Sequence, residues 1–170
     1  FYKSKLFRFN NLDFERYTIA NSKGLEVEIL NYGARITSIK IPIDSHTNSF
    51  EDVVLGYDSY KDYWTDTDYM NAIVGRVANR IRNSAFIING SKYSLSTNEG
   101  DHHLHGGKHG FDSKIWEFVE FIQNTDSVGV KLSISSPDKD EGYPGNLKIE
   151  LQLLLGDDNK LTIQTRAICD

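Results

Sequence analysis

The chain has 170 residues, of which 39% are hydrophobic and 12% aromatic, and its formal net charge at pH 7 is −5. This composition predicts one globular domain with a substantial core. The acidic balance provides no basic surface for a nucleic acid, and no apolar run approaches the roughly 20 residues that span a bilayer. We therefore expect neither a nucleic acid nor a membrane as a partner.

The amino-terminal residues and the cysteine content bear on location. Residues 1–6 lack the long apolar core of a signal peptide. The single cysteine, Cys169, cannot close an intrachain disulfide or supply a multi-thiolate zinc site. We therefore expect a cytoplasmic protein.

In the first part of the chain, apolar and polar residues alternate with the two-residue period of half-buried strands. Residues 25–29 and 39–43 form two such runs. The polar patch at 44–48 is expected to be a surface loop. Residues 59–69, rich in Tyr, Asp and Trp, are predicted to form a structured loop with room for a short helix at 58–64, and their aromatic rings are expected to pack into the core.

The same alternation continues to the end of the chain, in residues 116–118, 128–134, 147–153 and 161–163. Turn-forming residues separate the runs, at 31–33, 89–90, 124–127 and 156–159. Helical periodicity is nearly absent. We predict a single all-β domain over residues 1–170, a sandwich or large two-layer antiparallel assembly in preference to a small closed barrel.

Four of the five histidines fall within residues 99–109, a short stretch with glycines on both sides. Histidine exchanges protons near neutral pH. In an extended segment, His103 and His105 share one face and Leu104 takes the other, and the Gly106-Gly107 pair permits a sharp turn or the close approach of a ligand. We expect a pocket wall here that transfers protons or hydrogen bonds to a ligand.

Two other interpretations of this stretch stay open. His103, His105 and His109 could bind a metal. Such sites usually include a carboxylate shortly after the histidines, however, and the next carboxylate in this chain is Asp112. A histidine-rich surface turn is the simpler alternative, and it explains His102 and His109 better than His105.

Residues 75–82, Gly-Arg-Val-Ala-Asn-Arg-Ile-Arg, carry three arginines. The Asn79-Arg80 pair offers fixed donors suited to sugar hydroxyls, with anion binding as the alternative. Arg82 is interpreted as a surface charge. In residues 137–145, Tyr143 stands between glycine and proline, where it could wall a sugar site or simply stabilise a tight turn.

Five short motifs occur in the order and approximate spacing found in the galactose mutarotases, also called aldose 1-epimerases. They are Asn-Tyr-Gly-Ala at 31–34, Asp-Val-Val-Leu-Gly-Tyr at 52–57, Gly-Arg-Val-Ala-Asn-Arg-Ile at 75–81, Leu-His-Gly-Gly at 104–107 and Gly-Tyr-Pro-Gly at 142–145. The chain resembles this family from about residue 14 to its end. The Asn-Arg-Ile and Leu-His-Gly-Gly segments are the most specific.

The resemblance implies the amino-terminal portion of a galactose-mutarotase-like β-supersandwich, built from large antiparallel sheets. It implies an enzyme that interconverts the α and β anomers of a free hexose, galactose or glucose, by acid–base ring opening without a metal or organic cofactor. Asn79 and Arg80 match sugar-binding positions of the family. His105 matches the first of the two active-site histidines of the family. The resemblance therefore implies that His105 has a substrate-binding role and a catalytic role.

Two alternatives accompany this interpretation. The chain could be a non-catalytic relative that binds or senses sugars, or a mutarotase for hexose phosphates, in which Arg76 and Arg82 would face the pocket together with Arg80. The motifs carry no indication of the oligomeric state.

The resemblance also implies that part of the active site lies elsewhere. Family members are nearly twice as long, and their second histidine, their sugar-gripping aspartate and their glutamate base match positions beyond Asp170. We therefore expect these 170 residues to be inactive alone and to expose apolar faces such as residues 147–153.

Overall fold

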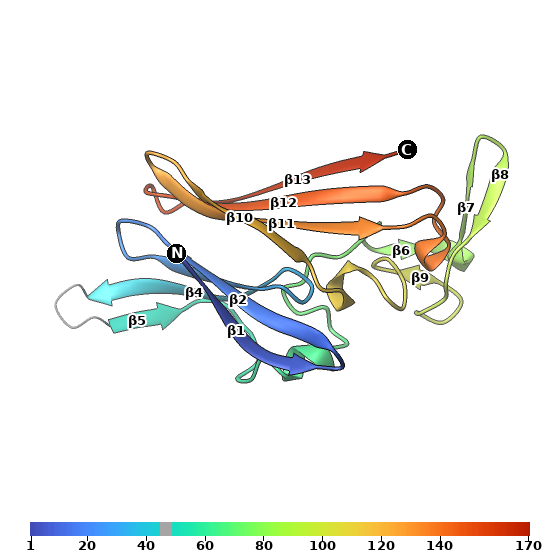
Figure 1. Cartoon of the computed structure of the whole chain (residues 1–170). Helices are drawn as coiled ribbons and strands as arrows, with labels where there is room; N and C mark the ends of the chain where they lie inside the picture. Colours follow the sequence, from blue (N-terminus) through green and yellow to red (C-terminus); the bar gives the residue numbers. More distant parts are fainter. Residues whose placement is uncertain (45–48) are drawn as a thin grey trace.

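The computed structural model describes residues 1–44 and 49–170. It contains two large antiparallel β-sheets that lie one over the other, with smaller ribbons at one end (Figure 1). The predicted all-β, two-layer architecture is confirmed. The surface loop predicted at 44–48 falls at residues 45–48 outside the described part of the chain.

The first sheet has five strands in chain order, each antiparallel to its neighbour. Its strands are β1 (Tyr2–Phe9), β2 (Leu12–Ala20), β3 (Glu26–Leu30), β4 (Arg35–Asp44) and β5 (Ser49–Asp52). The alternation in the sequence predicted β3 and β4 but not β1, β2 or β5. In β1 every side chain is exposed or half-buried, so its alternation is weak.

The second sheet has four strands, also antiparallel and in chain order. They are β10 (Glu117–Gln123), β11 (Ser127–Ser136), β12 (Leu147–Gly156) and β13 (Leu161–Cys169). The turns predicted at 124–127 and 156–159 close two of its hairpins, with Asn124 N–H donating to the Ser127 carbonyl at 2.9 Å and Gly156 N–H to the Lys160 carbonyl at 3.0 Å.

Two short ribbons lie beside the large sheets, and one of them contains the end of the 75–81 motif and the start of the 104–107 motif. They pair β6 (Arg80–Ile81) with β9 (His103–Leu104) and β7 (Ala85–Ile88) with β8 (Ser91–Ser94). The Asn89-Gly90 turn closes the β7–β8 hairpin, as predicted. The described residues also contain four short 3₁₀ helices: η1 (Asp62–Trp64), η2 (Arg82–Ser84), η3 (Phe111–Ser113) and η4 (Asp140–Gly142). None of the helices in 1–44 and 49–170 is long and apolar enough to cross a bilayer.

The main core lies between the two sheets. Val27 and Ile29 of β3 meet the inner face of the second sheet, and Leu151 and Leu153 of β12 are fully buried there. Burying such a side chain contributes roughly 1.5–3 kcal/mol. The expectation that residues 147–153 expose an apolar face is therefore wrong, because the first sheet covers it.

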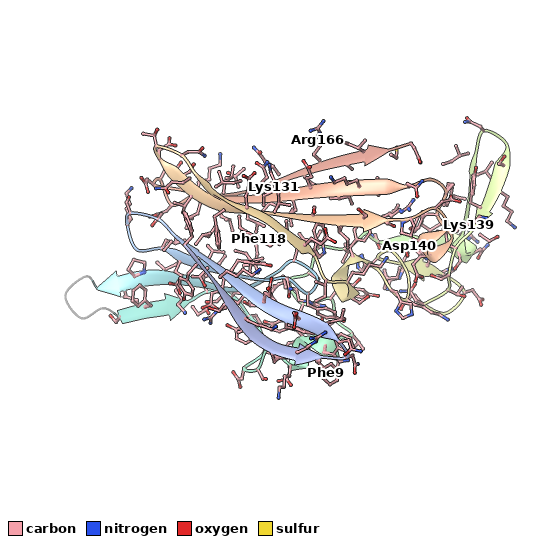
Figure 2. All side chains as sticks on the ribbon, viewed as in Figure 1. Phe9, Phe118, Lys131, Lys139, Asp140 and Arg166 are labelled. Carbon is pink, nitrogen blue, oxygen red and sulfur yellow. The ribbon has the colours of Figure 1, made fainter. Side chains whose placement is uncertain are left out.

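Side chains divide between the two faces of each sheet. Phe118 lies between the sheets and stacks on Tyr17, whereas Lys131 and Arg166 lie on the outer side of the second sheet (Figure 2). The predicted half-burial of residues 39–43 holds only in part, since Ile41 and Ile43 are 40% and 64% exposed. The pairing of β3 with β4 ends at Lys40, so β4 extends past the core.

A second cluster lies beneath the loop 57–70. Phe14, Leu30, Tyr32 and Tyr63 are buried in it, and Tyr57, Tyr60 and Trp64 pack against it partly buried. The predicted core packing of this aromatic stretch is therefore confirmed except for Tyr69, and η1 is its short helix. The buried ion pair between Arg35 and Asp66, at 2.6 Å, ties the loop to β4.

Candidate functional site

His105 follows β9 in a tight turn. Its φ of +51° is left-handed, and Gly107 N–H donates to the Leu104 carbonyl at 3.0 Å to close the turn. The chain therefore leaves the extended conformation at His105, so the prediction that His103 and His105 share one strand face is wrong. His103 is fully buried, and His105 is only half-buried.

Both ring nitrogens of His103 make hydrogen bonds. Its Nδ1 lies 2.7 Å from the Ser96 carbonyl, which only accepts, so Nδ1 carries the proton. In the neutral ring, Nε2 is then the acceptor for the Tyr143 hydroxyl, 2.8 Å away. Burial raises the pKa of Tyr143 to about 12, so this hydroxyl stays protonated at neutral pH. Both nitrogens of His103 are engaged, which leaves none for a metal.

Asn79 fixes the tautomer of His105. The backbone N–H of Asn79 donates to Nδ1 of His105 at 2.9 Å, and the N–H of His105 donates to the Asn79 carbonyl at 3.2 Å. A backbone N–H can only donate, so Nδ1 is unprotonated and the neutral ring carries its proton on Nε2. The imidazole therefore offers Nε2–H as a donor.

Arg80 lies beside this pair on β6, opposite Leu104 of β9. Its guanidinium donates to Oε1 of Glu99 at 2.7 Å, and the two side chains are 54% and 42% exposed. An exposed pair of this kind contributes little stability, so hydroxyl groups of a ligand can compete for the guanidinium. The side-chain carbonyl of Asn79 accepts the Arg80 backbone N–H at 2.9 Å.

The structure thus brings two of the predicted site residues, Asn79 and His105, into direct contact and places Arg80 next in the chain. Glycine allows the two motifs to meet: a Cβ on Gly106 would overlap the carbonyl oxygen of Gly75. The close approach of backbone to backbone explains why glycine stands at the centre of the histidine turn.

Sequence reasoning missed Tyr69 and Asn98. The Tyr69 ring packs edge-on against the His105 ring, with 4.7 Å between centroids, so its predicted place in the core is wrong. The Asn98 amide accepts from Leu104 N–H at 2.7 Å and donates to the carbonyls of Leu104 and Gly107. No periodicity or spacing singles out either residue, because their roles arise only from the folded loop.

A cavity of about 560 Å³ adjoins this group, within the range of small-molecule sites. Tyr69 and Glu99 belong to both its wall and the surroundings of His105 and Arg80. Burial raises the pKa of Asp112, which also lines the cavity. The other lining residues are Tyr32, Trp64, Thr65, Asp66, Thr67, Asn98, Leu104, Gly107, Lys108 and Ser113.

Arg76 has a structural role. Its guanidinium donates to the Ser136 hydroxyl and to the carbonyls of Ser136, Pro137, Pro144 and Gly145, at 2.8–2.9 Å. These bonds hold the 137–145 loop against the 75–82 segment. Arg76 is therefore not available to bind a phosphate, and the hexose-phosphate alternative loses one of the arginines that it requires.

Fold and site together define a two-layer β-sandwich protein with a histidine, asparagine and arginine gathered at one end of its sheets. The chain belongs to the aldose 1-epimerase family, whose model matches residues 15–170. It is 37% identical over 153 residues to aldose 1-epimerase of Escherichia coli (strain K12), covering 90% of this chain and 42% of that protein.

Two further similar proteins have names that belong to the same family. Galactose mutarotase of Bos taurus is 39% identical over 146 residues, covering 86% of this chain and 40% of the relative. The crystal structure of galactose 1-epimerase from Lactobacillus acidophilus NCFM superposes with a TM-score of 0.89 at 30% identity, covering 99% of this chain and 48% of that one. The chain thus spans about two fifths of the length of the curated relatives that it matches.

Proposed function

We propose that this chain forms the sugar-binding side of an aldose 1-epimerase site that interconverts the α and β anomers of free galactose or glucose. The observation that carries the proposal is the contact between Asn79 and Nδ1 of His105, which directs a donor, Nε2–H, away from the protein backbone. Arg80 adds guanidinium donors beside it. Donors of this kind suit the oxygens of a neutral sugar.

The proposed reaction moves protons only. A base removes the proton of the anomeric hydroxyl, an acid protonates the ring oxygen, and the C1–O5 bond breaks to give the open aldehyde. Rotation about C1–C2 and the reverse steps give the other anomer. Such acid–base groups contribute about 10²–10⁴-fold each. His105 and Arg80 bind and orient the sugar near its reacting end, and the resemblance assigns the glutamate base and second histidine to positions beyond residue 170.

Three parts of the proposal rest on the sequence analysis. The substrate is a small free hexose, the reaction uses neither a metal nor an organic cofactor, and the location is the cytoplasm. Chelation of metals should therefore leave the activity unchanged.

A chimera tests the activity. In it, this chain replaces the matching segment of the Escherichia coli aldose 1-epimerase, and polarimetry follows freshly dissolved α-galactose. We expect a folded chimera that accelerates mutarotation, and loses this activity in the Arg80→Met variant. A folded chimera that binds galactose without catalysis would favour the non-catalytic alternative, and one that does neither would contradict the proposal.

A further inference from the structure

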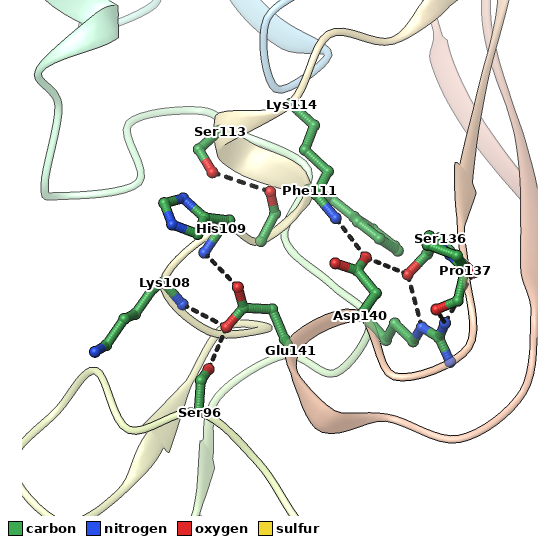
Figure 3. Close-up of polar contacts among 12 residues, drawn as sticks. Ser96, Lys108, His109, Phe111, Ser113, Lys114, Ser136, Pro137, Asp140 and Glu141 are labelled. Carbon is green, nitrogen blue, oxygen red and sulfur yellow. Dashed lines mark hydrogen bonds and ion pairs between the residues drawn. The ribbon is translucent and has the colours of Figure 1, made fainter.

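The carboxylate of Glu141, in η4, reaches across to the segment that follows the histidine turn. It accepts the backbone N–H groups of Lys108 and His109 at 2.9 and 3.0 Å, and the hydroxyl of Ser96 (Figure 3). Two consecutive N–H groups aimed at one anion form a concave anion-binding arrangement of the backbone. Here an acidic side chain of the protein itself occupies it.

The fit between this carboxylate and the turn is close. A Cβ added to Gly107 would overlap Oε2 of Glu141, so a larger residue at 107 would displace either the carboxylate or the turn. Glu141 also has a left-handed φ of +52°, an unfavourable conformation for a residue with a Cβ. Its three hydrogen bonds offset that cost.

The neighbouring acid, Asp140, does something different. It pairs with Lys114 and accepts from the Ser136 hydroxyl, away from the histidine turn (Figure 3). Burial tends to raise the pKa of Asp140, but the bonds from Lys114 and Ser136 outweigh it and hold the pKa below its usual value. The two adjacent carboxylates therefore hold different sets of partners. A variant of Asp140 can serve as a matched control for a variant of Glu141.

The turn that carries His105 is thus held on both sides. Asn98 bonds both backbone groups of Leu104 on one side, and Glu141 bonds Lys108 and His109 on the other. His105 and Gly106 lie between these two anchors. We expect that the turn changes conformation when either anchor is released, and that the imidazole then moves relative to Asn79.

We propose that Glu141 is a positioning residue of the sugar site: it fixes the turn 104–107 so that His105 keeps its bond to Asn79 and presents Nε2–H to the sugar. This inference rests on the proposed function for its sugar-binding part. Glu141 acts through the backbone, and does not itself contact the sugar.

The test uses the 170-residue chain, with variants Glu141→Ala and Glu141→Gln and the control Asp140→Asn. The ¹⁵N shifts of the His105 ring report its tautomer, and an NMR titration with galactose gives the Kd. In Glu141→Ala we expect the two ring nitrogens to move toward averaged shifts and the Kd to rise about tenfold. Glutamine retains an acceptor oxygen, so in Glu141→Gln we expect ring shifts and a Kd between those of the wild type and those of Glu141→Ala. Asp140→Asn should lower the Tm and leave both readouts unchanged.

Each outcome decides the inference. A folded Glu141→Ala protein with wild-type ring shifts and Kd would overturn it, as would the same changes in Asp140→Asn, which would indicate general destabilisation. If Glu141→Ala does not fold, Glu141→Asn replaces it, because asparagine tolerates the left-handed φ of +52° and is one methylene too short to hold both N–H groups. Wild-type ring shifts and Kd in the folded Glu141→Asn variant would also overturn the inference. A wild-type chain that binds no galactose contradicts the proposed function, and the ring shifts still decide the role of Glu141.

Discussion

Nδ1 of His105 accepts a hydrogen bond from the backbone N–H of Asn79 at 2.9 Å, so a residue of one motif sets the tautomer of the histidine in another. The two motifs lie 26 positions apart in the chain. Backbone groups do not titrate in the physiological range, and this donor therefore holds the Nε2–H form without the help of a carboxylate.

The first prediction concerns His105→Asn. Asparagine tolerates the left-handed φ of this position better than most residues, so the fold should survive and the Tm should change by a few degrees only. The donor toward the sugar is shortened and the imidazole is lost. In the chimera, we expect kcat/KM for α-galactose to fall by about 10²-fold or more, by polarimetry. An unchanged kcat/KM would contradict the role of His105 in the reaction.

The sequence predicted the strands that have a clear apolar alternation, because this signal is local, and it missed β1, β2 and β5. Alternation of apolar residues predicts which face of β12 is buried, and Asn89-Gly90 identifies a hairpin by its backbone preference alone. In β3 the alternation marks a strand, but both of its faces are buried. The same reasoning failed for Ile41 and Ile43, since it does not show where a neighbouring strand ends.

The site was predictable only in part. The motifs pointed to Asn79, Arg80 and His105, but extended geometry wrongly paired His105 with His103, because a left-handed turn leaves no periodic trace. The contributions of Tyr69, Asn98 and Glu141 come from loops that meet only in the folded chain.

The second prediction concerns the buried ion pair. Arg35 and Asp66 are at most 1% exposed, and Arg35 also donates to the Met70 carbonyl at 2.6 Å. Arg35→Met leaves the Asp66 charge buried and partly unpaired, at a cost of about 3–5 kcal/mol. Urea denaturation should show this loss. As a control, the exposed pair of Lys131 and Glu120 should contribute under about 1 kcal/mol when Lys131→Met breaks it.

The third prediction concerns alkaline pH. Burial raises the pKa of Tyr143 from 10.0 to about 12, so ionisation occurs first in the unfolded chain. The stabilisation is complete below pH 10 and is lost as the pH rises to 12, by up to about 2.7 kcal/mol for two pKa units.

Comparison with Tyr143→Phe isolates this effect. The variant removes the donor to His103 and should cost about 1–3 kcal/mol at pH 7. Its difference from the wild type should then shrink between pH 10 and 12, and other tyrosines cancel because both proteins have them. A difference that stays constant over this range would show that Tyr143 does not ionise differently in the two states.

The fourth prediction concerns β13, which pairs only with β12 within the described residues. An edge strand with exposed apolar residues favours association with another chain, and Ile163 is 46% exposed. Ile163→Lys should weaken self-association about tenfold in sedimentation equilibrium. Leu55→Lys adds the same charge to a loop residue that is 79% exposed and should have no such effect. Equal effects of both variants would attribute the change to net charge.

The last prediction is that residues 1–170 alone bind galactose without accelerating the exchange of its anomers. Ring opening needs a base for the anomeric proton as well as a donor such as Nε2–H of His105. The described carboxylates that line the cavity or hold the histidine turn are otherwise occupied. Glu99 pairs with Arg80, Asp66 pairs with Arg35, Glu141 holds Lys108 and His109, and Asp112 is buried with a raised pKa.

Exchange NMR with galactose measures the rate directly, against buffer and against the chimera. Catalytic groups act as a unit, so one donor without its base should leave the rate within about twofold of buffer, whereas the chimera exceeds it by orders of magnitude. If the chain alone accelerates the exchange, the base lies within it, and Glu99→Gln is the first variant to make, because the Glu99 carboxylate lines the cavity and is bound only by an exposed ion pair. Loss of the rate in that variant would transfer the role of base to Glu99.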